Sequence, residues 1–258
     1  MGKVMFWFVA VFAASSLLLC AAAEGGKRVV VVWSEGTEPK NVYPDGIKGA
    51  IAEGLTKDLP DWEVVKGGLN DPDQGVPDDL LKRCDVLIWW GHQKHGLVKD
   101  ELVAKIVKRV KEEGMGFIAL HSSHYAKPNK ALMATLVDDP NKAACSWGHY
   151  VADTTTTDVK VTDPKHPIAQ GIQDFTCANE ERYGDPYVVP KPLSVVFEGV
   201  SHMKNGQTER SQLGFTWEVG KGRMFYLQLG HESKPIFCDE NIRKIMANAV
   251  KWAAPEKK

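Results

Sequence analysis

The chain has 258 residues and a formal net charge of −1, with 43% hydrophobic and 25% charged residues. These values exclude a disordered chain, a coiled coil and a low-complexity scaffold, and they suit one large domain or two small ones. No run of five or more like charges occurs. The sequence therefore gives no support for a nucleic-acid partner or for binding to an acidic membrane surface.

The amino-terminal residues have the pattern of a targeting segment. Lys3 is followed by an apolar run over 4–19 and by three alanines at 21–23. This order is typical of a secretory signal peptide, and we expect cleavage of residues 1–23 before Glu24. An apolar run of about 16 residues is short for a membrane span. We therefore expect a secreted or periplasmic protein, residues 24–258, that forms one domain and keeps no stable membrane span.

Four cysteines would remain in the mature chain, Cys84, Cys145, Cys177 and Cys238. Their wide spacing differs from the dense disulfide framework of a small secreted domain, and they form no CxxC motif. Cys84 precedes a buried strand and is expected in the core. The sequence does not decide whether Cys145 and Cys177 form a disulfide.

Strands and helices alternate through the first half of the mature chain. Continuous apolar runs predict strands buried on both faces, and apolar residues three or four positions apart predict amphipathic helices. The helices are expected at 44–59 and 98–112, and the strands at 28–33, 62–65, 86–91 and 116–121. This alternation favours an α/β fold that is doubly wound, with a mostly parallel sheet and helices on both faces.

The second half of the chain has a different pattern. Residues 147–162 are rich in Thr and alternate in polarity, and further strands are expected at 195–200, 212–218 and 223–229 with short turns between them. This pattern predicts antiparallel strands added to the sheet edge in the C-terminal half. An amphipathic helix over 238–252 follows, and no linker or internal repeat divides the chain.

Histidines gather at the carboxyl ends of the predicted strands, which is where open α/β sheets bind ligands. His92 follows the third strand, and His121 ends the fourth, with His124 one turn further on. His231 follows the last strand. Because scattered loop positions rarely give four histidines at one edge, we expect them to share one site.

The fourth strand ends in a sequence that suits a sharp strand-to-helix turn. A nucleophile elbow needs small residues two positions before and two after its vertex. With Ser122 at the vertex both of those residues are too large, whereas with His121 they are Ala119 and Ser123, which fit. Histidine is a good metal ligand or acid/base but a poor acyl acceptor. A serine hydrolase is therefore disfavoured.

Two adjacent carboxylates, Glu180 and Glu181, precede a predicted Gly-Asp-Pro turn. In an extended segment they point to opposite faces, so only one can face the histidines, and Glu181 shares its face with Tyr183. His92, His121 and one carboxylate would suit zinc or a similar divalent metal with an open position for water or substrate. No strict ligand spacing such as H-E-x-x-H occurs, and a solvated charged loop is the other interpretation.

Four motifs in the same order resemble those of the ThuA-like, or trehalose-utilisation, family: Trp90–His92, Leu120–Tyr125, Glu180–Gly184 and Leu229–Glu232. The resemblance extends over roughly residues 27–253. It implies the flavodoxin-like α/β fold of class I glutamine amidotransferases. Those enzymes carry a cysteine at the elbow, where this chain has His121, so glutaminase activity is not expected.

The resemblance also implies a role in carbohydrate catabolism, because relatives are often encoded beside sugar dehydrogenases that make 3-keto sugars. We expect an exported enzyme of the isomerase, lyase or hydrolase type that acts on a disaccharide or an oxidised (3-keto) glycoside. A non-catalytic carbohydrate-binding or scaffold protein is the alternative, and a glutamine amidotransferase comes third. The oligomeric partner, like the oligomeric state, is unknown from the sequence.

Each candidate side chain receives a role in this hypothesis. The catalytic residues are His121, His231 and Glu181. The ligands of a divalent metal such as zinc are His92, His121 and His124. Sugar binding is assigned to polar and aromatic side chains near the strand ends, namely Trp33, Glu35, Tyr125, Tyr183 and Glu232. Trp33, Trp90 and Trp147 offer flat faces for a sugar, and core packing is their other interpretation.

Overall fold

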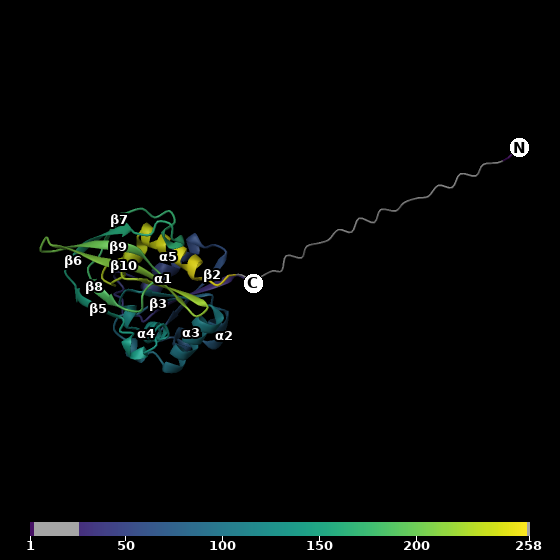
Figure 1. Cartoon of the computed structure of the whole chain (residues 1–258), viewed down its shortest axis with the longest axis horizontal. Coiled ribbons are helices and arrows are strands. Elements are labelled where there is room, and N and C mark those ends of the chain that lie inside the picture. Colours follow the sequence, from purple (N-terminus) through teal and green to yellow (C-terminus); the bar gives the residue numbers. More distant parts are fainter. Residues whose placement is uncertain (3–25, 257–258) are drawn as a thin grey trace.

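The structure is a computed structural model that describes residues 1–2 and 26–256. Residues 3–23 of the predicted signal peptide and its cleavage site lie in the segment 3–25, outside the described residues. The described part contains eleven strands and five α-helices (Figure 1).

The parallel half of a nine-stranded sheet consists of five strands. In spatial order they are β2 (Trp62–Gly68), β1 (Arg28–Ser34), β3 (Val86–Trp90), β4 (Gly116–Leu120) and β11 (Gly222–Leu227). Each neighbouring pair of these strands is parallel. All residues of β3 and β4 are buried, which is the result expected of continuous apolar runs in a sheet covered on both faces.

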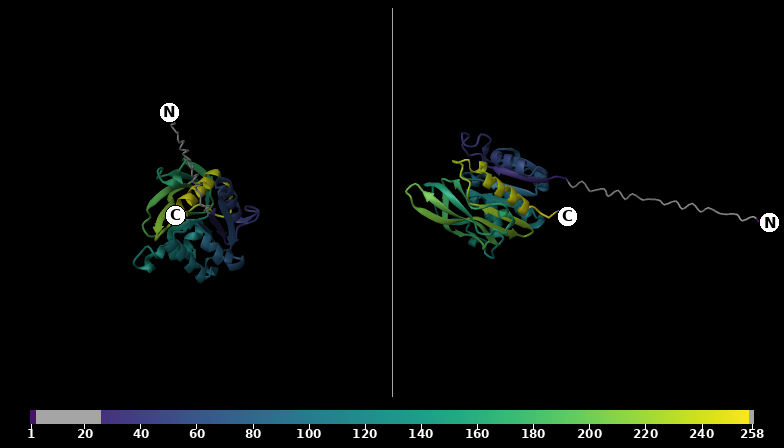
Figure 2. Two further views of the ribbon diagram at one scale, coloured as in Figure 1. Left: turned by 90° about the vertical axis from the view of Figure 1, so that its right-hand side faces the viewer. Right: turned by 90° about the horizontal axis from the view of Figure 1, so that it is seen from above.

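Helices cover both faces of this half (Figures 1 and 2). On one face α1 (Gly46–Asp58) and α5 (Glu240–Ala253) pack against the sheet. The other face carries α2 (Asp78–Arg83), α3 (Asp100–Glu113) and α4 (Lys127–Ala134). Each face buries its own apolar cluster. The predicted doubly wound α/β class is therefore confirmed, although α2 and α4 had no counterpart in the sequence prediction.

Four strands continue the sheet beyond β11. They are β10 (Thr208–Val219), β9 (Ser194–Met203), β6 (Thr154–Val161) and β7 (Phe175–Ala178), and every pairing from β11 outward is antiparallel. The expected antiparallel addition is present, with one difference. Strand β11 is antiparallel to β10 but parallel to β4, so it joins the two halves.

A separate two-stranded sheet pairs β5 (Ser146–Val151) with β8 (Arg182–Val188) in antiparallel fashion. The predicted Gly-Asp-Pro turn is wrong, because Gly184 to Pro186 lie inside β8. Proline lacks a backbone N–H and is tolerated in a strand with a free edge. The small sheet packs beside β10, on the face of the large sheet that also carries α2, α3 and α4.

The carboxyl ends of four parallel strands lie side by side. The last residues of β1, β3 and β4 are paired in register, Ser34 with Trp90 and Trp90 with Leu120, and Leu227 of β11 lies opposite Leu120. The residues that follow each strand therefore emerge at one edge. This register explains how positions more than 100 residues apart in the chain meet in one site.

The disulfide between Cys145 and Cys177, which the sequence left open, is not formed. Cys145 and Cys177 are free and buried, and they belong to the apolar clusters on opposite faces of the sheet. Cys84 is buried as predicted, and Cys238 is exposed. Within the described ranges, no helix is both long and apolar enough to cross a membrane.

Candidate functional site

The backbone turns sharply at His121, the first residue after β4. Its φ of 52° lies in the left-handed region, which costs free energy for a residue other than glycine. A Cβ at Gly230 would lie 2.7 Å from the Phe237 ring and 3.4 Å from the Cβ of His121, so glycine is needed where the two turns approach each other. The vertex predicted from the small neighbours of His121 is therefore confirmed.

Ser123 ties this elbow to the end of β3. Its hydroxyl donates to the carbonyl of Trp89 at 3.0 Å and accepts from the N–H of Gly91 at 2.8 Å. Both groups are buried, so the two bonds fix the backbone directly before His92. Ser123 thus has a positioning role in addition to being small enough for the elbow.

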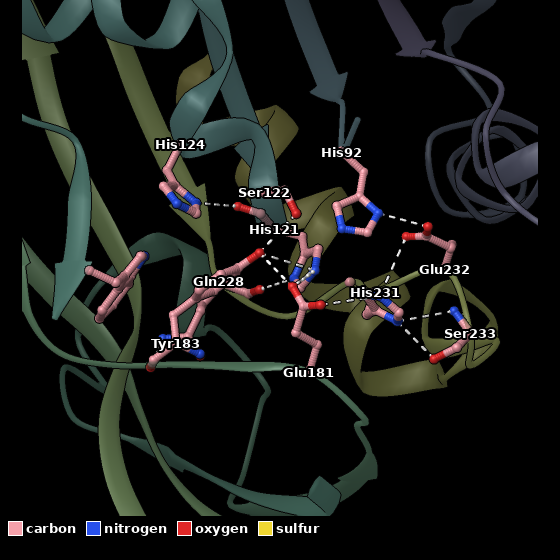
Figure 3. A network of polar contacts seen from close by, with 12 residues as sticks. His92, His121, Ser122, His124, Glu181, Tyr183, Gln228, His231, Glu232 and Ser233 are labelled. Atoms are coloured by element: carbon pink, nitrogen blue, oxygen red, sulfur yellow. Dashed lines mark hydrogen bonds and ion pairs between the residues drawn. The ribbon is translucent and has the colours of Figure 1, made fainter. Parts of the chain in front are cut away.

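Three histidines and one carboxylate converge at the sheet edge (Figure 3). His92, His121, His231 and Glu181 each offer one ligand atom, and these four atoms lie within 4.8 Å of one another. Nε2 of His121 is 3.2 Å from Oε1 of Glu181, and Nε2 of His231 is 3.4 Å from its Oε2. Metal–ligand bonds of 2.0–2.1 Å in a tetrahedral site give ligand separations of about 3.4 Å. The donor set and these two histidine–carboxylate distances are therefore compatible with a divalent metal such as zinc.

The other nitrogen of each imidazole is held by a polar group outside the cluster. Nδ1 of His92 lies 2.7 Å from Oε1 of Glu232, and Nδ1 of His121 lies 2.9 Å from the carbonyl oxygen of Gln228. Nδ1 of His231 lies 2.8 Å from the Ser233 hydroxyl. The carboxylate beside His92 and the carbonyl beside His121 are acceptors of the kind that orient histidine ligands in metal sites. Nδ1 of His231 differs, because it also accepts from the backbone N–H of Ser233 at 3.3 Å.

The contacts of His121 require a positive group between its ring and Glu181. A carbonyl oxygen only accepts, so Nδ1 of His121 carries the proton that faces Gln228. Its Nε2 faces a carboxylate oxygen at 3.2 Å. Two bare acceptors would repel each other at that distance, so a proton or a metal ion must separate them. The ring is fully buried and reaches the site only through Nε2.

Charges in the cluster keep its carboxylates ionised. Burial alone would raise the pKa of Glu181, but the hydrogen bond and charge of His121 and the Tyr183 hydroxyl outweigh it and lower that pKa to about 2. Burial and the nearby His121 lower the pKa of His231. For His92, the hydrogen bond and charge of Glu232 outweigh burial and raise the pKa.

Hydroxyl groups connect Glu181 to the open side of the site. The Tyr183 hydroxyl donates to Oε1 of Glu181 at 2.7 Å and lies 2.8 Å from the hydroxyl of Ser122. Glu181 and Tyr183 lie on the same side of their segment, as predicted. A pocket of about 180 Å³ opens here, lined by His92, Ser122, Tyr125, Tyr150, Glu181 and Tyr183.

Three side chains with expected roles lie outside this cluster. His124 is directed into aromatic rings behind the site, with Nδ1 3.1 Å from the His121 carbonyl, and burial lowers its pKa to about 3. Trp33 is 1% exposed and stacks on Trp89. Buried Glu35 accepts from the backbone N–H groups of residues 93 and 94. The structure therefore does not bring the expected metal ligand His124 or the expected sugar-binding residues Trp33 and Glu35 into the cluster.

The remaining candidate residues lie in or beside the pocket. Tyr125 and Tyr183 line it, and Glu232 supports His92. Trp90 and Trp147 are buried, so core packing is the correct interpretation for both. The sequence reasoning missed Tyr150, Gln228 and Ser233. Gln228 could have been noticed as a polar residue directly after an apolar strand. Its backbone carbonyl contacts His121, and its side-chain amide donates to the Tyr183 carbonyl at 3.0 Å and accepts from the Tyr183 N–H at 3.3 Å.

The fold and the site together define a flavodoxin-like α/β protein with a histidine–carboxylate cluster at the carboxyl edge of its sheet. The chain belongs to the ThuA family, described as trehalose utilisation, whose family model matches residues 28–253. None of the curated proteins matches the sequence.

Solved structures with the same fold include relatives and more distant proteins. A ThuA-like protein from Parabacteroides merdae has 14% identity and a TM-score of 0.63, covering 90% of this chain and 93% of its own. One from Bacteroides uniformis has 17% identity and a TM-score of 0.58, with 95% of both chains covered. A glutamine amidotransferase from Thermotoga maritima has 11% identity and a TM-score of 0.51, covering 87% of this chain and 96% of its own. At these identities the similarity shows the fold alone.

Proposed function

We propose that this protein is an exported metal-dependent enzyme of carbohydrate catabolism that acts on a disaccharide or a 3-keto glycoside. The observation that carries the proposal is the arrangement of His92, His121 and His231, each with Nδ1 held from outside and all three gathered around Glu181. Buried ionisable groups cost folding free energy unless they are paired, so such clusters concentrate at functional sites. The family described as trehalose utilisation supports a sugar as substrate.

The residues divide into a metal-holding set and a substrate-facing set. His92, His121, His231 and Glu181 would hold the metal, which when bound acts as a Lewis acid on a substrate oxygen or lowers the pKa of a bound water. The hydroxyls of Ser122 and Tyr183 line the pocket beside Glu181 and can hydrogen-bond a sugar hydroxyl or carbonyl. Without a metal, the same histidines would serve as acid/base groups.

A glutaminase reaction finds no support in this site. That chemistry needs a reactive thiolate, and the elbow carries His121 instead. Burial raises the pKa of the thiols of Cys84, Cys145 and Cys177 to about 12, so these thiols stay protonated at neutral pH. A glutamine amidotransferase therefore remains less favoured than a carbohydrate enzyme or a carbohydrate-binding protein.

Metal analysis combined with sugar assays tests the proposal. We expect purified protein to contain about one equivalent of a divalent metal, and turnover of trehalose or its 3-keto derivative to stop on chelation and return with metal. Glu181→Gln should lower metal content and turnover together. His202→Ala is the matched control, because it removes an imidazole–carboxylate pair, 2.7 Å from Nε2 to Asp158 Oδ2, on a partly exposed part of β9.

Two outcomes would contradict the enzyme proposal. Sugar binding with no turnover of any sugar or keto-sugar, with or without metal, would favour the non-catalytic carbohydrate-binding alternative. Release of ammonia from glutamine would favour an amidotransferase. Activity that survives complete removal of metal would leave an enzyme with histidine acid/base groups and would refute the metal role.

Export is a further part of the proposal, supported by the signal-peptide pattern of residues 1–23. Amino-terminal sequencing of protein recovered from the periplasm or the medium should begin at Glu24. A chain that stays in the cytoplasm and keeps Met1 would contradict export without affecting the proposed reaction.

A further inference from the structure

Two tyrosines at the mouth of the pocket are unusually exposed. Tyr125 keeps 44% and Tyr150 64% of its area exposed, although most large aromatic side chains of the described part are buried. Both line the pocket that holds Glu181 and Tyr183. Exposed aromatic surface next to a polar pocket is typical of a surface that a ligand covers.

The small sheet fixes the position of Tyr150. In the β5–β8 pairing Tyr150 lies directly opposite Tyr183, and residues opposite each other in antiparallel strands project from the same face. Their ring centroids are 6.4 Å apart. Tyr150 therefore stands on the same side as the buried Tyr183 but further toward solvent, above the hydroxyl that contacts Glu181.

Tyr125 is held from a different element, the 3₁₀ turn His121–Tyr125 that follows β4. Its ring packs on the buried His124 ring with centroids 4.0 Å apart, and Nζ of Lys130 lies 5.1 Å from its centroid. These contacts orient the ring while almost half of the side chain stays exposed. The mouth thus has one anchored aromatic ring on the turn after β4 and one on the small sheet.

We propose that Tyr125 and Tyr150 form an aromatic mouth that stacks on the C–H faces of a glycoside and determines its binding. The inference rests on the proposed function and assigns Tyr150 a role that the sequence did not suggest. Sugar rings combine apolar C–H faces with hydroxyls at their edges, and this mouth combines two exposed aromatic side chains with the hydroxyls of Ser122 and Tyr183.

The size of the pocket limits what can enter. A volume of about 180 Å³ is smaller than the pockets of about 300–1,000 Å³ that enclose whole drug-sized ligands. One sugar ring can occupy it, and the second ring of a disaccharide must extend past the mouth. The two tyrosines should therefore favour disaccharides over monosaccharides.

Calorimetric titration of trehalose and of glucose into the full protein tests this inference, with chelated protein as a second sample. We expect Tyr150→Ala and Tyr125→Ala each to weaken trehalose binding about fivefold to tenfold, and Tyr150→Phe to stay within about twofold of wild type because stacking needs no hydroxyl. Leu193→Ala, at a side chain 63% exposed outside the pocket lining, is the matched control and should have no effect.

The outcomes separate this inference from the proposed function. If wild type binds and converts sugar but both alanine variants bind it equally well, the aromatic mouth is wrong and the enzyme proposal stands. If Tyr150→Phe weakens binding as much as Tyr150→Ala, stacking is not the cause. If wild type binds neither sugar in either metal state, the carbohydrate assignment fails and the aromatic mouth fails with it.

Discussion

Replacing His121 tests whether the elbow supplies chemistry as well as structure. His121→Ala removes the 2.9 Å bond to the Gln228 carbonyl and leaves that buried acceptor unpaired, which costs about 1–3 kcal/mol. Each kcal/mol lowers the melting temperature by about 2–4 °C in a chain of this size, so we expect a loss of about 2–12 °C. Loss of a metal ligand or a positioned acid/base should lower kcat/KM by at least about 10²-fold.

His121→Asn separates the two effects. Asparagine tolerates the left-handed backbone better than most residues, and its side-chain amide can donate to the same carbonyl. We expect this variant to recover most of the lost melting temperature but none of the turnover or metal content, measured by thermal unfolding, steady-state kinetics and metal analysis. Full activity in His121→Asn would refute the role of the imidazole. An Asn variant as unstable as His121→Ala would refute the hydrogen-bond argument.

Three further predictions concern groups around the site. Ser123→Ala removes the hydrogen bonds to Trp89 and Gly91 but none of the metal ligands, and it should lower metal affinity about 10-fold or more. Metal affinity is measured by competition with a chelator, and an unchanged value would contradict this prediction. Burial lowers the pKa of His124 to about 3. The folded protein therefore keeps the full stabilisation from the neutral ring above about pH 6.5 and loses it progressively as the pH falls toward 3. In His124→Gln, the melting temperature should depend less on pH over that range. A thiol reagent applied to the folded protein should modify exposed Cys238 without loss of activity; inactivation that requires one of the buried thiols would refute the noncatalytic assignment of Cys84, Cys145 and Cys177.

The elbow could be predicted from sequence because it depends on local sterics. A tight turn at one residue demands small neighbours at fixed offsets, and only His121 among the candidates has them. The histidines at the other strand ends could be predicted for a related reason. A parallel sheet brings its carboxyl ends to one edge, so finding the strands was enough to place His92 and His231 near His121.

The positions of the Trp33 and Glu35 side chains could not be predicted from the strand ends alone. Both follow or end a strand at the correct edge, but their side chains turn away from the site, Trp33 onto Trp89 and Glu35 onto the backbone of residues 93 and 94. Direction at a strand end depends on packing between distant segments. Tyr150 was missed for the same reason, since its position follows from pairing with Tyr183, more than 30 residues later.

The bend at His121 makes the chemistry of this fold exchangeable. The left-handed backbone there is held by its surroundings, Gly230 on one side and the bonds of Ser123 on the other, and not by the imidazole alone. Residues that tolerate the left-handed region, such as asparagine and aspartate, could occupy such a vertex at a similar conformational cost. A single codon change can therefore place a different functional group at the same point while the scaffold stays the same. The fold determines the position of the reactive group, and the residue at position 121 determines its chemical identity.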